Sequence, residues 1–304
     1  MSASFPNMIW WLTTACFLCG LRCPEAAGQV VYPESEWVQA QPRELGLNLK
    51  DLERAREYAM SAGGSGMITR SGVVVKRWGD QRRKYDLKST SKSIGVTALG
   101  LAIDDGKIGL DDQARLHQPE LGVPPAENMN AGWIDQISIR DLANQSAGFE
   151  KPGGYGKLLF QPGSRWHYSD GGPNWLAECV TLAMGKDIET LMFERVLRPI
   201  GITPDDLHWR THQYRPAKIG TLRRCEFGSG VHANVDAMAR IGLLYLRRGN
   251  WKGKQILSES FVDSVSHPEP AISDLDEWVE EHGDASSHYG LLWWNNADGT
   301  LKEI

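Results

Sequence analysis

The pattern of apolar and polar residues predicts a helix, a hairpin and a buried helix in the first third of the chain. In LNLKDLERAREYAMSAGG, apolar residues recur at helical spacing after Asn48, a residue suited to cap a helix N-terminus, and a glycine pair ends the segment. GMITRSGVVVKRWGD then has two runs of strand-forming residues separated by Ser71-Gly72, which predicts a tight hairpin. From residue 90 to 105 the chain is apolar on nearly every side, which predicts a helix buried in a core and stopped by Gly106.

The rest of the chain alternates helical segments with loops rich in proline and glycine before it returns to a strand. Four segments have helical spacing: ISIRDLANQSAGF, NWLAECVTLAMG, IETLMFERVLRPIG and NVDAMARIGLLYLRRGNW. HYGLLWW, near the end, again has the character of a strand. This order predicts an α+β fold: an antiparallel sheet with flanking helices, interrupted by a large helical insertion, with a cleft between the two parts.

We expect four segments along the chain. Residues 1–28 are predicted to be a signal peptide and 29–85 the N-terminal part of an α/β domain. Residues 86–225 form the predicted helical domain, and 226–304 contribute a helix and a return strand to the α/β domain, which is incomplete without its final strands and helix.

The first segment has the pattern of a secretory leader. Its apolar run MIWWLTTACFLCGL is shorter than the roughly 20 residues that a membrane-spanning helix needs. Small residues follow, and cleavage between Gly28 and Gln29 fits them. The sequence therefore predicts a secreted or periplasmic protein, with no stable membrane span after the leader is removed. Of the five cysteines, Cys179 and Cys225 would then remain, either as one disulfide or as two buried thiols; we favour the thiols.

Composition narrows the classes of function. A chain of 304 residues, 41% of them hydrophobic, can bury a large core in one domain or in two interleaved ones. A net charge of −5 provides no basic field for nucleic acid. The sequence has no His-Glu-x-x-His and no paired Cys-x-x-Cys, so we expect no metal and no other cofactor. It also has no Gly-x-Ser-x-Gly, so we do not expect an α/β-hydrolase site.

Ser89 and Lys92 form the chain's one Ser-x-x-Lys sequence, at the start of the predicted buried helix. Residues three apart lie on one face of a helix, so the Lys92 amine can reach the Ser89 hydroxyl and take its proton. The helix N-terminus would also stabilise a developing oxyanion. The ordinary interpretation of the same residues is that Ser89 caps the helix and Lys92 is a solvated side chain of its first turn.

Longer segments around this motif resemble a known superfamily. STSKSIGVTALGLAIDDGKIGLDD, ISIRDLANQSAGF, QPGSRWHYSDGGPNWLAECV and ANVDAMARIGLLYLRRGNWKGKQIL occur in the order found in serine β-lactamases and penicillin-binding proteins. The resemblance is to the class C β-lactamase, esterase and D-aminopeptidase-like branch, and it covers about Leu45 to Trp294. It implies a β-lactamase/transpeptidase-like fold and a serine hydrolase that works through an acyl-enzyme.

The resemblance also implies roles for single residues. Ser89 is the acylated nucleophile, Lys92 its partner, and Tyr168 the phenol that shares the serine proton and passes it to the leaving group. Such a role needs a Tyr168 pKa well below about 10, and we expect the Lys92 charge to lower it. Asp170 stands where the family has asparagine and, if ionised, would pair with Lys92. An alternative alignment sets Ser169-Asp170 against the Ser-Asp-Asn motif of other members, but the residues before Tyr168 favour the first alignment.

Other positions of the family pattern are less well matched. EFGSGVHAN, which contains Gly230, is predicted to form a glycine-rich turn beside the cleft, with His232 as a candidate that faces the substrate. Gln145 replaces a histidine found in many relatives, and the sequence does not explain this change. The family's third motif, a lysine- or histidine-containing strand whose backbone completes the oxyanion hole, is not evident. His288-Tyr289-Gly290 has the right order, but its surroundings resemble the strand before that motif.

We therefore expect a hydrolase of small esters, β-lactams or D-amino acid peptides, with a simple ester or small amide as the first choice. The third motif and the final strands are expected after Ile304. Because the third motif provides an oxyanion donor, and losing such a donor costs roughly 10²–10³ in rate, we expect this chain alone to be weak or inactive. The alternative is an inactive binding module of the same fold. It is motivated by Asp170, which replaces the family's asparagine, and by the third motif, which is not evident in this sequence. The expected partner is a small molecule and not nucleic acid, and the sequence does not indicate an oligomeric state.

Overall fold

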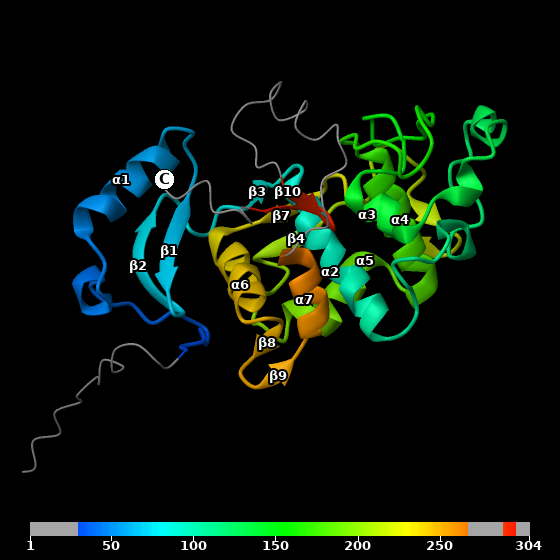
Figure 1. The fold of residues 1–304 in the computed structure, drawn as a ribbon. Helices are drawn as coiled ribbons and strands as arrows, with labels where there is room; N and C mark the ends of the chain where they lie inside the picture. Colours follow the sequence, from blue (N-terminus) through cyan, green and yellow to red (C-terminus); the bar gives the residue numbers. More distant parts are fainter. Residues whose placement is uncertain (1–29, 267–287, 296–304) are drawn as a thin grey trace, which may run out of the picture.

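The computed structural model describes residues 30–266 and 288–295, so the predicted signal peptide lies outside the described residues (Figure 1). Its α-helices are α1 (Leu49–Met60), α2 (Thr90–Asp104), α3 (Ile139–Asn144), α4 (Gly171–Met184), α5 (Ile188–Met192), α6 (Val235–Leu246) and α7 (Glu259–Ser266). Its strands are β1 (Gly66–Arg70), β2 (Val73–Trp78), β3 (Tyr85–Asp86), β4 (Leu207–Trp209), β5 (Lys218–Ile219), β6 (Leu222–Arg223), β7 (Val231–Ala233), β8 (Asn250–Trp251), β9 (Lys254–Gln255), β10 (His288–Gly290) and β11 (Trp293–Asn295). The mixture of helices and antiparallel strands confirms the predicted α+β class.

The N-terminal elements form as the sequence predicts. The Asn48 side chain accepts a hydrogen bond from the Lys50 backbone N–H at 2.8 Å and thereby caps α1. β1 and β2 pair in antiparallel fashion around a two-residue turn, in which Ser71 has φ 53° and Gly72 has φ 82°. Two residues with positive φ suit the right-handed twist of a hairpin, which explains the glycine at position 72. Figure 1 shows α1 lying beside this hairpin at one end of the molecule.

A short central sheet joins segments that lie far apart in the sequence. β3 and β4 both pair with β7, so the order is β3-β7-β4 and all pairs are antiparallel. Asp86 of β3 and His208 of β4 both lie opposite His232 of β7. Because β3 precedes the long helical region and β7 follows it, the sheet brings the start of α2 next to the glycine-rich segment before β7.

The helix α2 is the centre of the core. Nearly all of its residues from Ser91 to Ala102 are buried, and it packs against α4 and α5. Such complete burial agrees with its sequence, which is apolar on nearly every side. Gly106, with φ 65°, follows the helix and ends it as predicted.

Cys179 and Cys225 are both buried free thiols, so the favoured prediction is confirmed. Burial raises the pKa of both thiols, that of Cys225 to about 11. Each helix within residues 30–266 is too short or too polar to cross a bilayer.

The segment HYGLLWW is a hairpin and not a single strand, which corrects the prediction. Leu291 (φ 45°) and Leu292 (φ 63°) form its turn in a backbone region that non-glycine residues rarely adopt. Both leucines are buried, and their backbone N–H groups donate to the Asn144 side chain and to the Ala143 carbonyl, each at 2.9 Å. The packing of this turn against the end of α3 therefore stabilises a conformation that leucine alone would not favour.

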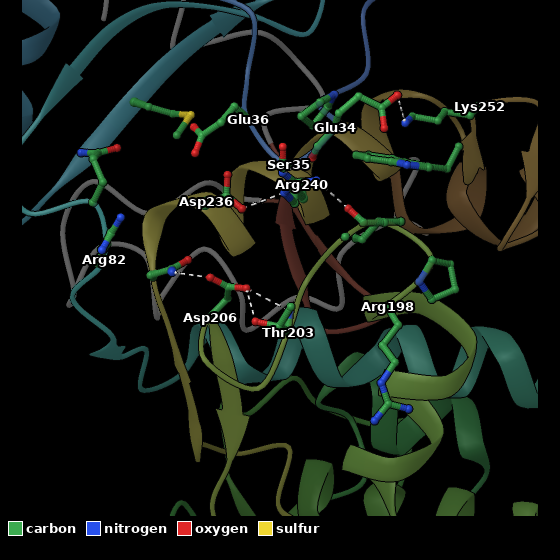
Figure 2. A pocket seen from close by; sticks show the side chains of 18 of the residues that line it. Glu34, Ser35, Glu36, Arg82, Arg198, Thr203, Asp206, Asp236, Arg240 and Lys252 are labelled. Atoms are coloured by element: carbon green, nitrogen blue, oxygen red, sulfur yellow. Dashed lines mark hydrogen bonds and ion pairs between the residues drawn. The ribbon is translucent and has the colours of Figure 1, made fainter.

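A polar cavity of about 760 Å³ is bounded by the N-terminal segment, by helix α6 and by the loop that follows α5. Figure 2 shows that several charged side chains lining it pair with one another. Asp236 binds Arg240, and Lys252 binds Glu34. None of Ser89, Lys92 and Tyr168 lines this cavity, so the candidate active site is elsewhere.

Candidate active site

The turn from β3 into α2 presents Ser89 at the helix start. Lys88, the residue before it, has φ 48°, and the Asp86 carboxylate holds it by accepting from its backbone N–H (3.1 Å) and its ammonium group (2.6 Å). Ser89 itself has helical dihedrals, and its side chain makes no capping hydrogen bond. Ser89 therefore occupies the N-cap position of α2, as the ordinary interpretation has it, but its side chain does not cap the helix and its hydroxyl is available for other contacts.

Lys92 is a buried lysine that points at Ser89. Its side chain is only 2% exposed, so the interpretation as a solvated first-turn residue is wrong as well. Its Nζ donates to Ser89 Oγ at 3.2 Å and to the Gly228 carbonyl at 2.8 Å. A third bond goes to Asp170 Oδ1, so the pairing of Lys92 with Asp170 expected from the sequence is present.

Tyr168 completes the group around Ser89. The Tyr168 and Ser89 side chains share a hydrogen bond, and Lys92 Nζ lies 4.7 Å from the centre of the Tyr168 ring. Trp166, Tyr289 and Trp294 surround the tyrosine with aromatic contacts. The structure thus brings together Ser89, Lys92 and Tyr168 as the family resemblance implies.

The electrostatics of the group differ from the expectation. Burial raises the pKa of Tyr168, and the hydrogen bond from Ser89 opposes this only in part, so the predicted lowering of the tyrosine pKa is wrong. Burial lowers the pKa of Lys92, while Asp170 acts in the opposite direction. Lys92 is therefore the group that the protein makes easier to deprotonate, and Tyr168 the group that keeps its proton.

Gln145 is a positioning residue whose role the sequence did not reveal. It follows α3 with φ 65° and is buried. Its amide donates to the Ser169 carbonyl (3.0 Å) and accepts from the Ser169 backbone N–H (3.0 Å) and hydroxyl (3.1 Å), so it fixes the residue between Tyr168 and Asp170. Because the Ser169 hydroxyl is bound to Gln145, the geometry favours Tyr168 over the Ser169 alignment.

The glycine-rich segment approaches the site closely, but through Gly228 and not through Gly230. The Gly228 carbonyl binds Lys92, and its N–H donates to the Asn174 side chain at 2.9 Å. A Cβ on Gly228 would lie 2.8 Å from the Asp170 Cβ, a distance that side chains do not tolerate. Gly230 has φ 114° and serves the turn into β7. The predicted role of Gly230 in or behind the substrate-binding site stays a prediction.

His232 lies in β7, and its ring stacks on that of His208 with 4.7 Å between centres. Its described interactions are with His208 and Asp86, and none of them reaches Ser89, so its role toward substrate stays a prediction. His288 belongs to β10, but its side chain lies outside the described residues. Among residues 30–266 and 288–295, no three histidine, cysteine or acidic side chains gather as a metal site would require.

The close approach at Gly228 can be tested by mutation. Gly228→Ala is expected to displace Asp170 and so to disturb Lys92, which should lower kcat/KM for an ester by about tenfold or more, as small misplacements of catalytic groups do. Gly242→Ala in α6 is the matched control, since a Cβ there meets nothing within 4 Å and alanine favours a helix. Equal activities of the two purified variants would show that the contact at Gly228 does not matter.

The chain is similar in sequence to one protein family and in fold to several solved structures. A family model described as Beta-lactamase matches residues 50–296. Among solved structures, a protein of Bacteroides dorei DSM 17855 designated a beta-lactamase is 17% identical, with a TM-score of 0.62 over 81% of this chain and 79% of that chain. A beta-lactamase of Mycobacterium bovis is 20% identical, with a TM-score of 0.55 over 77% and 74% of the two chains. The octameric penicillin-binding protein homologue of Pyrococcus abyssi is 15% identical, with a TM-score of 0.56 over 81% and 64%.

No curated protein matches the sequence. At identities of 15–20% the solved structures show a shared fold and not a shared substrate. The family model, however, covers most of the chain and includes Ser89, Lys92 and Tyr168. The fold, the ordered motifs and this match agree, and the chain therefore belongs to the beta-lactamase family.

Proposed function

We propose that the protein is a serine hydrolase that acylates Ser89 with a small ester, a β-lactam or a D-amino acid peptide and releases the acyl group with water. A simple ester or small amide is the first choice. One observation carries the proposal: the Ser89 hydroxyl is bonded both to the buried Lys92 amine and to the Tyr168 phenol. We also propose that the protein is secreted or periplasmic, on the basis of its leader-like N-terminal sequence.

In this proposal Lys92 is the proton acceptor for acylation. Ser89 Oγ attacks the carbonyl carbon of the substrate while its proton moves to the neutral Lys92 Nζ, whose pKa is lowered by burial. The positive end of α2 lies beside the oxyanion that forms. When the bond to the leaving group breaks, Tyr168 gives its proton to that group and regains one from Lys92. Water then attacks the acyl carbon and gives a proton to Lys92. The bond between the acyl carbon and Ser89 Oγ breaks, Oγ takes a proton back from the Lys92–Tyr168 pair, and the carboxylic acid leaves.

One observation favours the second candidate, a binding module of the same fold. The Asp170 carboxylate forms an ion pair with Lys92, which favours the charged form of the lysine. A lysine that stays charged cannot take the serine proton, and the site would then bind ligands without turnover.

Mass spectrometry separates these two functions. The purified protein is treated with p-nitrophenyl acetate and, separately, with a chromogenic cephalosporin. We expect an acyl adduct on Ser89 and release of more than one equivalent of product, both absent in Ser89→Ala and retained in Ser164→Ala, which changes an exposed serine. Saturable binding with no adduct in the unmodified protein would contradict the hydrolase and support the binding module.

A further inference from the structure

The Asp170 carboxylate lies between two lysines of different character. Its Oδ1 binds the buried Lys92, and its Oδ2 accepts a hydrogen bond from Lys151 Nζ at 2.8 Å. The Lys151 side chain is 54% exposed, whereas that of Lys92 is 2% exposed. One oxygen of the carboxylate thus faces the buried site and the other faces the solvent-accessible edge.

Two further contacts fix Lys151 in this place. The Asp170 backbone N–H donates to the Lys151 carbonyl at 2.8 Å, so the two residues are joined through backbone and side chain. The Lys151 ammonium also lies 4.9 Å from the centre of the Tyr168 ring. Because half-exposed ion pairs add little to stability, the arrangement calls for an explanation other than folding.

The chemistry of the site provides one. Asparagine at position 170, as in the family pattern, would carry no charge, whereas a carboxylate that pairs with Lys92 alone would hold the lysine proton firmly. A second positive charge on the same carboxylate partly cancels the attraction of Asp170 for the Lys92 proton, so Lys92 loses that proton more easily. It also occupies the outer oxygen, so Asp170 cannot turn both oxygens toward Lys92.

We propose, on the basis of the hydrolase function above, that Lys151 is a positioning residue that shares the Asp170 carboxylate with Lys92, so that Asp170 orients Lys92 without preventing it from accepting the Ser89 proton. Lys151 then compensates for the aspartate that stands in place of the family's asparagine. It acts through Asp170 and Tyr168.

Several other charged or titratable groups face these residues. Glu226 stabilises the charged form of Lys92 from the segment before β7. Tyr289 of β10 faces Tyr168, and burial raises the pKa of both phenols. His167 lies near Lys151, and burial together with the Lys151 charge lowers the pKa of its imidazole. These groups remain when Lys151 is changed, so a shift caused by its removal has a defined sign.

Removal of the Lys151 charge favours protonated Lys92 and disfavours ionised Tyr168. Both changes raise the pH at which neutral Lys92 or ionised Tyr168 becomes available to accept the Ser89 proton. For Lys151→Met, we therefore expect the acidic limb of the pH profile of kcat/KM, measured with p-nitrophenyl acetate, to move upward by about 1 pH unit. Lys151→Arg, which keeps the charge, should retain the original profile.

Two control variants test the route of the effect. In an Asp170→Asn background, Lys151→Met should shift the limb by much less, because there is no carboxylate to share. His167→Gln should leave the limb in place, which shows that His167 is not the group that titrates. An unmoved limb in Lys151→Met, or an equal shift in Lys151→Arg, overturns the inference.

A measurement without turnover keeps this inference separate from the proposed function. The Lys92 side-chain signal in protein labelled with ¹³C-lysine is assigned with Lys92→Met and titrated by NMR. We expect its pKa to be higher in Lys151→Met than in the unmodified protein. An unchanged value contradicts the role of Lys151, even if the protein hydrolyses no ester, whereas an inactive protein with the expected shift contradicts only the hydrolase.

Discussion

Replacing Lys92 with methionine will lower kcat/KM for an activated ester by about 10²–10⁴-fold, the contribution of a positioned general base. The variant removes the amine that lies 3.2 Å from Ser89 Oγ and leaves Tyr168 as the remaining neighbour. Because burial raises the pKa of Tyr168, the phenol cannot replace the lysine as proton acceptor near neutral pH. Initial rates of p-nitrophenolate release over a range of ester concentrations measure the effect.

Lys92→Arg distinguishes a proton acceptor from a fixed positive charge. Arginine keeps the charge and can pair with Asp170, but it does not lose a proton at accessible pH. We expect this variant to be nearly as slow as Lys92→Met, whereas most of the activity would survive if Lys92 acted only by its charge. Lys186→Met, which breaks an exposed ion pair with Glu194, is the control for the loss of a lysine, and circular dichroism checks that all variants fold.

The second large effect concerns stability. Glu178→Gln should lower the free energy of unfolding by about 3–5 kcal/mol, as expected when one partner of a buried ion pair is removed. Glu178 is 1% exposed and binds Arg215 at 2.8 Å, Arg224 at 3.0 Å and the Gln118 amide at 2.7 Å. Glutamine has a similar shape but no charge, so two buried guanidinium groups would lose their compensation. Urea unfolding followed by tryptophan fluorescence measures the change.

This network also supports the candidate site. Arg215 donates to the carbonyls of Gly154 (2.9 Å) and Gly171 (3.3 Å), and Gly171 follows Asp170 directly. Lys252→Gln is the matched control, because it breaks an exposed pair with Glu34 and should change stability by no more than about 1 kcal/mol. If Glu178→Gln were as mild as this control, the buried charges would not be important for folding.

The local part of the fold could be predicted from the sequence. The Asn48 cap, the Ser71-Gly72 turn and the helical conformation of α2 depend on neighbours within one or two turns, which periodicity and residue type describe well. The hairpin turn at Leu291 and Leu292 could not be predicted in this way, because its strained backbone is stabilised by packing against α3.

For the candidate site, the sequence by itself determined that Ser89 and Lys92 lie on one face of a helix, and the family resemblance added Tyr168. Only the tertiary structure decided that Lys92 is buried, that Gly228 and Gln145 position its neighbours, and that Lys151 shares Asp170 with it. The reason is physical. Spacing along a helix follows from backbone geometry alone, whereas burial, pKa and the choice of charged partners depend on groups that the fold brings together from distant segments.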